Sequence, residues 1–122
     1  MTTDSVLAVL KRDTELLKLQ KAIKGEEGAI LAGFHTKERY RNRGYTEQDI
    51  KSCILTGQVI EVQRGVNVRY KCECRNLTVK GVDSSGNDFI CVLSQISQKN
   101  NIYIVVTIMP PCDMKRFGKL IA

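Results

Sequence analysis

The amino-terminal part of the chain carries apolar residues at helical spacing. Between Ser5 and Ile23, leucine, valine and isoleucine side chains recur every three or four positions, which predicts one amphipathic helix. Gly25 and Gly28 interrupt this pattern, and residues 29–34 then form a short apolar link. The chain is therefore expected to begin with a long helix followed by a break.

Two shorter helices are expected after this link. The polar segment that begins at His35 contains no helix breaker before Gly44, which should end it in the left-handed conformation. Thr46 then precedes acidic residues up to Asp49, an arrangement that caps a helix and places negative charge at its positive end. Apolar residues at helical spacing follow, and Gly57 should stop this helix.

Beyond residue 57 the pattern changes to the period of two and the β-branched residues that are typical of strands. Short polar segments at 83–88 and 98–101 read as turns, which favours an antiparallel meander. The last strand is almost wholly apolar and is the best candidate for a central position. The expected fold class is α+β, with two to three N-terminal helices packed on one face of a four- to five-stranded, mainly antiparallel sheet. The expected strands are Val59 to Val62, Val68 to Cys74, Leu77 to Val82, Phe89 to Leu93 and Ile102 to Met109.

The charge of the chain is unevenly distributed. The 122 residues have a formal net charge of +6 and a pI of about 9.2. Residues 1–30 contain five basic and five acidic residues, whereas the remainder contains fourteen basic and eight acidic ones. Basic residues are densest at 37–43, 64–80 and 115–119. A polyanion such as RNA is the partner that this surface attracts most directly, through phosphate contacts and counterion release.

The cysteines argue for reduced, structural thiols. Their number is odd, and their positions, 53, 72, 74, 91 and 112, are irregular, so a complete disulfide framework is not expected. Their spacing fits no zinc motif, and the acidic residues are scattered, so we expect no metal and no cofactor. We also expect a cytoplasmic protein without a membrane partner, since the chain lacks a long apolar stretch and a signal-peptide pattern.

The most informative residues for chemistry follow the single histidine, His35. An imidazole is the side chain whose ordinary titration range best suits proton transfer near neutral pH. Arg39 and Arg43 follow at intervals of four residues, so the three side chains should share one helix face. An imidazole and two guanidinium groups can move a proton and hold a phosphate. In the alternative interpretation His35 only caps the helix, and the arginines pair with neighbouring carboxylates.

The run from His35 through Arg39 and Arg43-Gly44 to the strand Ile104–Pro111 resembles a bacterial domain-of-unknown-function family, number 4258. Its members read as His, three residues, Arg, three residues, Arg-Gly, a helix, and then a small sheet ending in a hydrophobic strand with threonine. That family is regarded as similar to the RelE and BrnT types of toxin, compact α+β ribonucleases of toxin–antitoxin pairs. The resemblance covers about residues 34 to 111 and implies a RelE-like fold.

The resemblance also implies an activity, metal-independent endoribonuclease cleavage, and two partners: RNA, free or on the ribosome, and a cognate antitoxin protein. Cleavage needs an acid, a base and cations for the developing phosphorane charge. His35 and Arg39 would fill two of these roles, and Tyr70 would act as a stabiliser or acid. The cations expected to bind RNA are Lys37, Arg43, Arg69, Lys71 and Lys80.

Residues 1–30, an N-terminal amphipathic helix and linker, lie outside the resemblance, whereas residues 31–122 are expected to form the toxin-like α+β domain that it implies. The first helix could mediate self-association into a homo-oligomer. Two other functions stay open at this point. The chain could be a non-enzymatic module whose basic face binds nucleic acid or an acidic protein, or a structural protein that assembles through its first helix.

Overall fold

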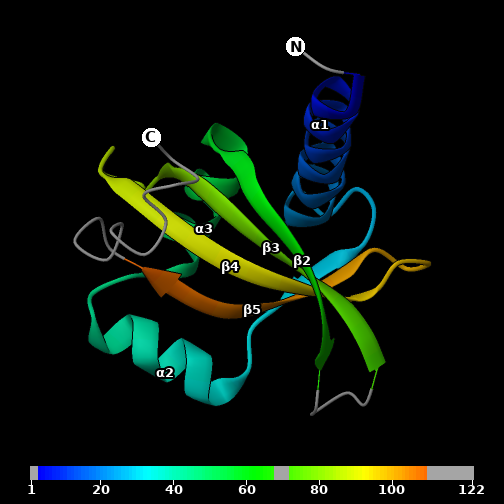
Figure 1. Cartoon of the computed structure of the whole chain (residues 1–122). Coiled ribbons are helices and arrows are strands. Elements are labelled where there is room, and N and C mark those ends of the chain that lie inside the picture. Colours follow the sequence, from blue (N-terminus) through cyan, green and yellow to red (C-terminus); the bar gives the residue numbers. More distant parts are fainter. Residues whose placement is uncertain (1–2, 68–71, 110–122) are drawn as a thin grey trace.

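The computed structural model describes residues 3–67 and 72–109 (Figure 1). Three helices and five strands follow one another along these described residues. They are α1 (Thr3–Ile23), β1 (Ala29–Leu31), α2 (Phe34–Asn42), α3 (Glu47–Thr56), β2 (Gln58–Asn67), β3 (Cys72–Val82), β4 (Asp88–Ser97) and β5 (Ile102–Met109). The expected fold class is confirmed, since this is an α+β chain whose helices pack against a mainly antiparallel sheet.

The sheet has the order β1-β5-β4-β3-β2. Strands β2 to β5 form the expected antiparallel meander, and β5 lies inside the sheet between β4 and β1. The predicted turn at 83–88 is confirmed, because Gly86 has φ +85° and its N–H donates to the Asp83 carbonyl at 3.0 Å. Local turn chemistry therefore fixed the connection between β3 and β4.

Two expectations about the strands were wrong. Residues 29–31 were expected to be part of a link, but they form strand β1, which pairs in parallel with β5 from Ala29 opposite Ile102 to Leu31 opposite Ile104. Three residues are too few to show a strand period, so only the partner strand reveals them. In addition, β3 runs without interruption over 72–82, where the pattern predicted two strands. Residues 68–71 of the expected strand lie outside the described part of the chain.

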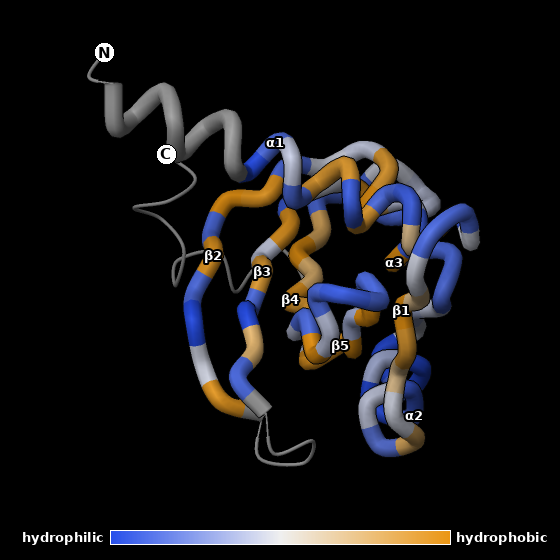
Figure 2. Tube along the Cα trace, turned by 90° about the vertical axis from the view of Figure 1, so that its right-hand side faces the viewer, coloured by the Kyte–Doolittle hydropathy of each residue, from blue (hydrophilic) through white to orange (hydrophobic). Residues whose placement is uncertain are grey.

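The hydrophobic core lies between the helices and one face of the sheet. Phe89, Cys91 and Leu93 alternate along β4 and turn their side chains to this face, where each is fully buried. Helix α3 covers them with its apolar stripe, and Leu19 of α1 completes the core with no exposed surface. Figure 2 shows the contrast between the mainly hydrophobic inner strands and the mainly hydrophilic α2.

A chain of hydrogen bonds, most of them between side chains, joins α1 to the sheet. The guanidinium of Arg75 on β3 donates to both carboxylate oxygens of Glu15 on α1, at 2.6 and 2.9 Å, and to Gln95 of β4 at 3.1 and 2.5 Å. Gln95 donates in turn to the Tyr103 hydroxyl, and that hydroxyl donates to Asn101. Helix α1 is therefore held by an ion pair in addition to its apolar contacts.

The start of α3 is tied to the turn between β3 and β4 through Asp49. The carboxylate accepts a hydrogen bond from the Thr46 N–H at 2.8 Å, as the capping pattern predicted, and from the N–H and hydroxyl of Ser84. Burial by itself would raise the pKa of Asp49, but the hydrogen bonds from Ser84 and Thr46 outweigh it and lower that pKa below its usual value.

We expect Asp49→Asn to lower the free energy of unfolding at pH 7 by about 1 to 2 kcal/mol, because charged hydrogen-bond acceptors are lost. The folded-state pKa is depressed, so the contribution of Asp49 is present above its unfolded pKa of roughly 4 and disappears as the pH falls through the folded value. Urea unfolding of wild type and variant between pH 2 and 7 should show curves that converge at the acidic end. Asp88→Asn, an exposed carboxylate, serves as control. A constant difference across this range would contradict the assignment.

Among the described residues, no helix is long and apolar enough to cross a bilayer.

Candidate functional site: the α2 face

Helix α2 carries the residues that the sequence singled out. It begins after Gly33, whose backbone is extended, and Gly44 with φ +86° ends the turn that follows it, as predicted. Tyr40 is its single fully buried side chain and anchors the helix in the core. The other side chains of α2 are half-buried or exposed, so this short helix presents most of its surface to the surroundings.

Arg39 and Arg43 lie together over the end of β5. They line a small cavity of about 40 Å³ with Thr36 and Tyr40 of α2 and with residues 106–108 of β5. A guanidinium nitrogen of Arg43 donates to the Ile108 carbonyl at 3.4 Å, beyond the point where β1 stops pairing with β5. The guanidinium of Arg39 makes no ion pair or hydrogen bond with any residue the structure describes, so its donors are free for a ligand.

His35 is exposed at the first turn of the same helix. Its ring contacts Phe34 edge to face, with 5.6 Å between the ring centroids, and it does not line the cavity that Arg39 and Arg43 share. Position and exposure leave the imidazole accessible to a ligand, and it makes no hydrogen bond or ion pair with a described residue. The structure thus brings the two arginines together more closely than it joins them to the histidine.

Lys37 lies on the other flank of α2. It lines a separate cavity of about 260 Å³ between α2, β1 and α3, together with Tyr40 and Glu47. Burial, followed by the neighbouring Glu47 carboxylate, raises the pKa of Tyr40 to about 12, so this phenol stays protonated at neutral pH. Because Lys37 lines this separate cavity, it does not extend the surface formed by Arg39 and Arg43.

The remaining predicted residues belong to the sheet. Lys80 follows the core residue Val79 on β3, so its side chain lies on the sheet face that points away from the helices. Arg69, Tyr70 and Lys71 lie outside the described residues. Of the eight site residues that the sequence proposed, the described part of the chain thus brings Arg39 and Arg43 together around one cavity.

A carboxylate near α2 pairs with an arginine other than Arg39 and Arg43. Glu47 forms an ion pair with Arg41 on the exposed side of the helix, in which Nη2 of Arg41 donates to Oε1 of Glu47 at 2.5 Å. The backbone N–H of Glu47 and this hydrogen bond from Arg41 keep the pKa of Glu47 below its usual value. Arg41 engages Glu47, and Arg39 remains unpaired within the described chain. The alternative interpretation, in which Arg39 pairs with a neighbouring carboxylate, did not anticipate this.

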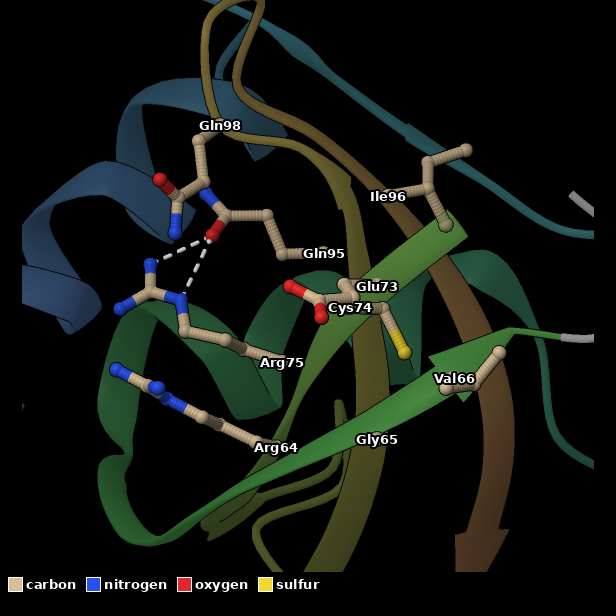
Figure 3. A pocket seen from close by; sticks show the side chains of 9 residues that line it. All are labelled: Arg64, Gly65, Val66, Glu73, Cys74, Arg75, Gln95, Ile96 and Gln98. Atoms are coloured by element: carbon tan, nitrogen blue, oxygen red, sulfur yellow. Dashed lines mark hydrogen bonds between the residues drawn. The ribbon is translucent and has the colours of Figure 1, made fainter. Parts of the chain in front are cut away.

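Sequence reasoning missed a third cavity, which lies at the opposite end of the strands and is larger than the two described above. It has a volume of about 660 Å³ and is lined by residues of β2, β3 and β4, among them Arg64 and Arg75 (Figure 3). The cluster of basic residues at 64–80 was visible in the sequence. Only the pairing register reveals that Arg64 and Arg75 lie directly opposite each other.

Metal and thiol chemistry find little support in the described residues. Residues 3–67 and 72–109 contain no cluster of three metal-binding side chains. Burial raises the pKa of the Cys53 thiol to about 12, and burial also raises that of Cys91 well above its usual value. Since the thiolate is the nucleophile, these two cysteines are inert packing residues.

Comparison with known proteins identifies the family. The family described as "Domain of unknown function (DUF4258)" matches residues 33–110, so the chain belongs to it. This range begins just before α2 and contains the whole α2 face, whereas α1 and β1 precede it. No curated protein and no solved structure matches the chain.

Proposed function

We propose that this protein is a relative of the RelE- and BrnT-type toxins that binds RNA through the exposed face of α2. The observation that carries the proposal is the pair of guanidinium groups, Arg39 and Arg43, at one cavity, with Arg39 unpaired among the described residues. Arginine binds phosphate oxygens bidentately through its planar fork of donors. The net charge of +6 adds a long-range attraction for a polyanion.

The size of the cavity favours binding at the surface over enclosure of a nucleotide. About 40 Å³ accommodates one phosphate oxygen or a water molecule, and a nucleotide is several times larger. The phosphodiester would therefore lie across α2, with its oxygens directed at Arg39 and Arg43. Contacts of this type neutralise the backbone without reading the bases, so the binding is expected to be largely independent of sequence.

Cleavage is the finer part of the proposal. His35 lies one turn from Arg39 along α2, so an RNA strand held by the arginines passes the imidazole. The imidazole would accept the proton of the ribose 2′-hydroxyl as that oxygen attacks the phosphorus, while the arginines stabilise the charge on the phosphorane. The bond from phosphorus to the 5′-oxygen would then break, leaving a 2′,3′-cyclic phosphate, and the departing 5′-oxygen would take a proton from water. A cognate antitoxin and the ribosome are the further partners that a toxin of this kind implies. Reduced thiols at Cys53 and Cys91 fit a cytoplasmic location.

The test measures binding of a fluorescein-labelled single-stranded RNA by anisotropy. Arg39→Ala/Arg43→Ala is expected to weaken binding about tenfold at 100 mM salt and to lower the slope of log K against log salt by about 1.4, which corresponds to two lost phosphate contacts. The matched control is Lys24→Ala/Lys51→Ala, which removes the same charge from exposed positions outside α2. Equal losses in both double variants would mean that net charge alone drives binding.

The same RNA resolved on a denaturing gel tests cleavage. His35→Ala should keep RNA binding within about twofold of wild type, because the phosphate contacts remain, and should abolish fragment formation. Intact RNA with the wild-type protein would reject the ribonuclease and leave the binding module. Loss of binding in His35→Ala would instead make the imidazole part of the RNA contact.

A further inference from the structure

The cavity of about 660 Å³ lies at the end of the sheet away from α2, on the face that α1 covers in part. It opens beside the last residues of β2 and β4 and the first residues of β3. Its volume of about 660 Å³ lies within the range of ligand pockets, which runs from roughly 300 to 1,000 Å³. Figure 3 shows the side chains of Arg64, Glu73 and Arg75 directed to the same side of the sheet.

One wall of this cavity is fixed in place. Both carboxylate oxygens of Glu15 and the amide oxygen of Gln95 engage Arg75, so its guanidinium cannot turn away. Gln95 is itself held through the Tyr103 hydroxyl and is 2% exposed. A site whose polar wall is already ordered costs less conformational entropy when a ligand binds.

The other two charged groups at the cavity have no partner in the described ranges 3–67 and 72–109. Arg64 lies directly opposite Arg75 in the register of β2 and β3, and like charges at such positions repel each other. Glu15 neutralises Arg75. Arg64 makes no ion pair or hydrogen bond with any described residue, and the same holds for Glu73, although both side chains line the cavity. Among the residues that the structure describes, Arg64 and Glu73 are therefore an unpaired cation and an unpaired carboxylate at separate points of the cavity.

A free cation and a separate free carboxylate select a particular kind of ligand. A simple anion would be attracted by Arg64 and repelled by Glu73. A simple cation would be attracted by Glu73 and repelled by Arg64. A nucleotide satisfies both groups, because its phosphate is anionic and its base can donate hydrogen bonds. Guanine fits a carboxylate best, since its N1–H and N2 amino group lie side by side on one edge and form two parallel hydrogen bonds to the two oxygens. The amide of Gln98 adds a donor and an acceptor at the same wall.

We propose that this cavity binds a guanine nucleotide, with its phosphate on Arg64 and its base edge on Glu73. This site is separate from the α2 face and does not rest on RNA binding there. Uracil serves as the discriminating base, because its single N3–H lies between two carbonyl oxygens that would repel the carboxylate. Guanosine lacks the phosphate, and inorganic phosphate lacks the base, so the two fragments separate the contributions of the two ends.

The test is a titration of the full chain with GMP, UMP, guanosine and inorganic phosphate, followed by calorimetry and by the backbone amide signals of residues 64–66, 73–75 and 95–98. We expect GMP to bind at least tenfold more tightly than UMP or either fragment and to shift these signals. Arg64→Ala should weaken the binding of GMP at least tenfold. Glu73→Gln should weaken the binding of GMP while leaving the binding of UMP unchanged. Lys99→Ala, an exposed cation next to Gln98, is the matched control and should bind GMP like wild type.

Three results would overturn the proposal. They are phosphate bound as tightly as GMP, shifts confined to residues outside the cavity, and wild-type GMP affinity in Arg64→Ala. Because Arg64 is exposed on an edge strand, the alanine variant should fold, and its circular dichroism and melting temperature verify this. Arg64→Lys keeps the charge and loses the planar fork, so it should bind GMP with intermediate affinity. The Arg39→Ala/Arg43→Ala variant should retain full GMP binding, which keeps this result independent of the RNA experiment.

Discussion

Replacing Arg75 by leucine is expected to lower the free energy of unfolding by about 3 kcal/mol, the scale of a broken buried ion pair. The guanidinium is about one quarter exposed and the Glu15 side chain only 10% exposed. The variant therefore leaves a carboxylate enclosed between α1 and the sheet without its cation. Gln95 also loses the donor of two hydrogen bonds. Urea unfolding followed by circular dichroism would measure the change.

The neighbouring arginine supplies the control for this experiment. Arg64 has the same chemistry, lies directly across the strand pair and has no partner among the described residues, so Arg64→Leu should change stability by no more than about 0.5 kcal/mol. A second control closes the cycle: Glu15→Leu/Arg75→Leu removes both charges and should be at least 1 kcal/mol more stable than Arg75→Leu. The cycle also needs Glu15→Leu alone. If the loss of stability in the double variant equals the sum of the losses in Glu15→Leu and Arg75→Leu, the ion pair is not the cause.

The second large effect is expected at Gly81, where α3 lies flat on β3. A Cβ added there would overlap the carbonyl oxygen of Cys53 and would approach its Cα to 3.0 Å. These are backbone atoms of a packed helix, so the whole of α3 would have to move. We expect Gly81→Ala to lower the free energy of unfolding by about 3 kcal/mol, at the upper end of the usual cost of overpacking.

Gly65→Ala is the matched control for Gly81→Ala. Its added Cβ would meet the Asn76 side-chain nitrogen at 3.4 Å and the Cys74 sulfur at 4.0 Å, which are the ends of movable side chains. A change within about 0.5 kcal/mol is expected there. Thermal unfolding of both variants provides the comparison. An effect at Gly81 as small as at Gly65 would show that α3 can withdraw from the sheet at little cost.

Two glycines that contact α3, Gly57 and Gly81, differ in how clearly the sequence reveals their roles. Gly57 was recognised as the end of α3, because a glycine after an amphipathic stretch is a local signal. Gly81 lies inside a β-branched run and carries no such signal, since its requirement arises from a helix that precedes it by some 25 residues. The same holds for Glu15, whose partner Arg75 is sixty positions away.

The α2 face was predicted in part. Spacing by four residues correctly placed Arg39 and Arg43 on one side of a helix, because the helical repeat is fixed by backbone geometry. The same spacing placed His35 in their row. His35 does lie one turn before Arg39 in α2, but the cavity begins at Thr36 and does not include it. Lys37, two positions before Arg39, faces the opposite flank.

The sequence by itself determined the elements whose signals are local: the three helices, the end at Gly44, the capping residue Asp49, the turn at Gly86 and the antiparallel meander. Backbone conformation and hydrogen bonds within a few residues decide these features. Only the tertiary structure decided that residues 29–31 form a strand, that Arg64 lies opposite Arg75, and that Glu15 neutralises Arg75 while Arg64 has no partner in the described part of the chain. Strand register and helix docking depend on contacts between distant residues, and a shift of one residue would turn each strand side chain to the other face.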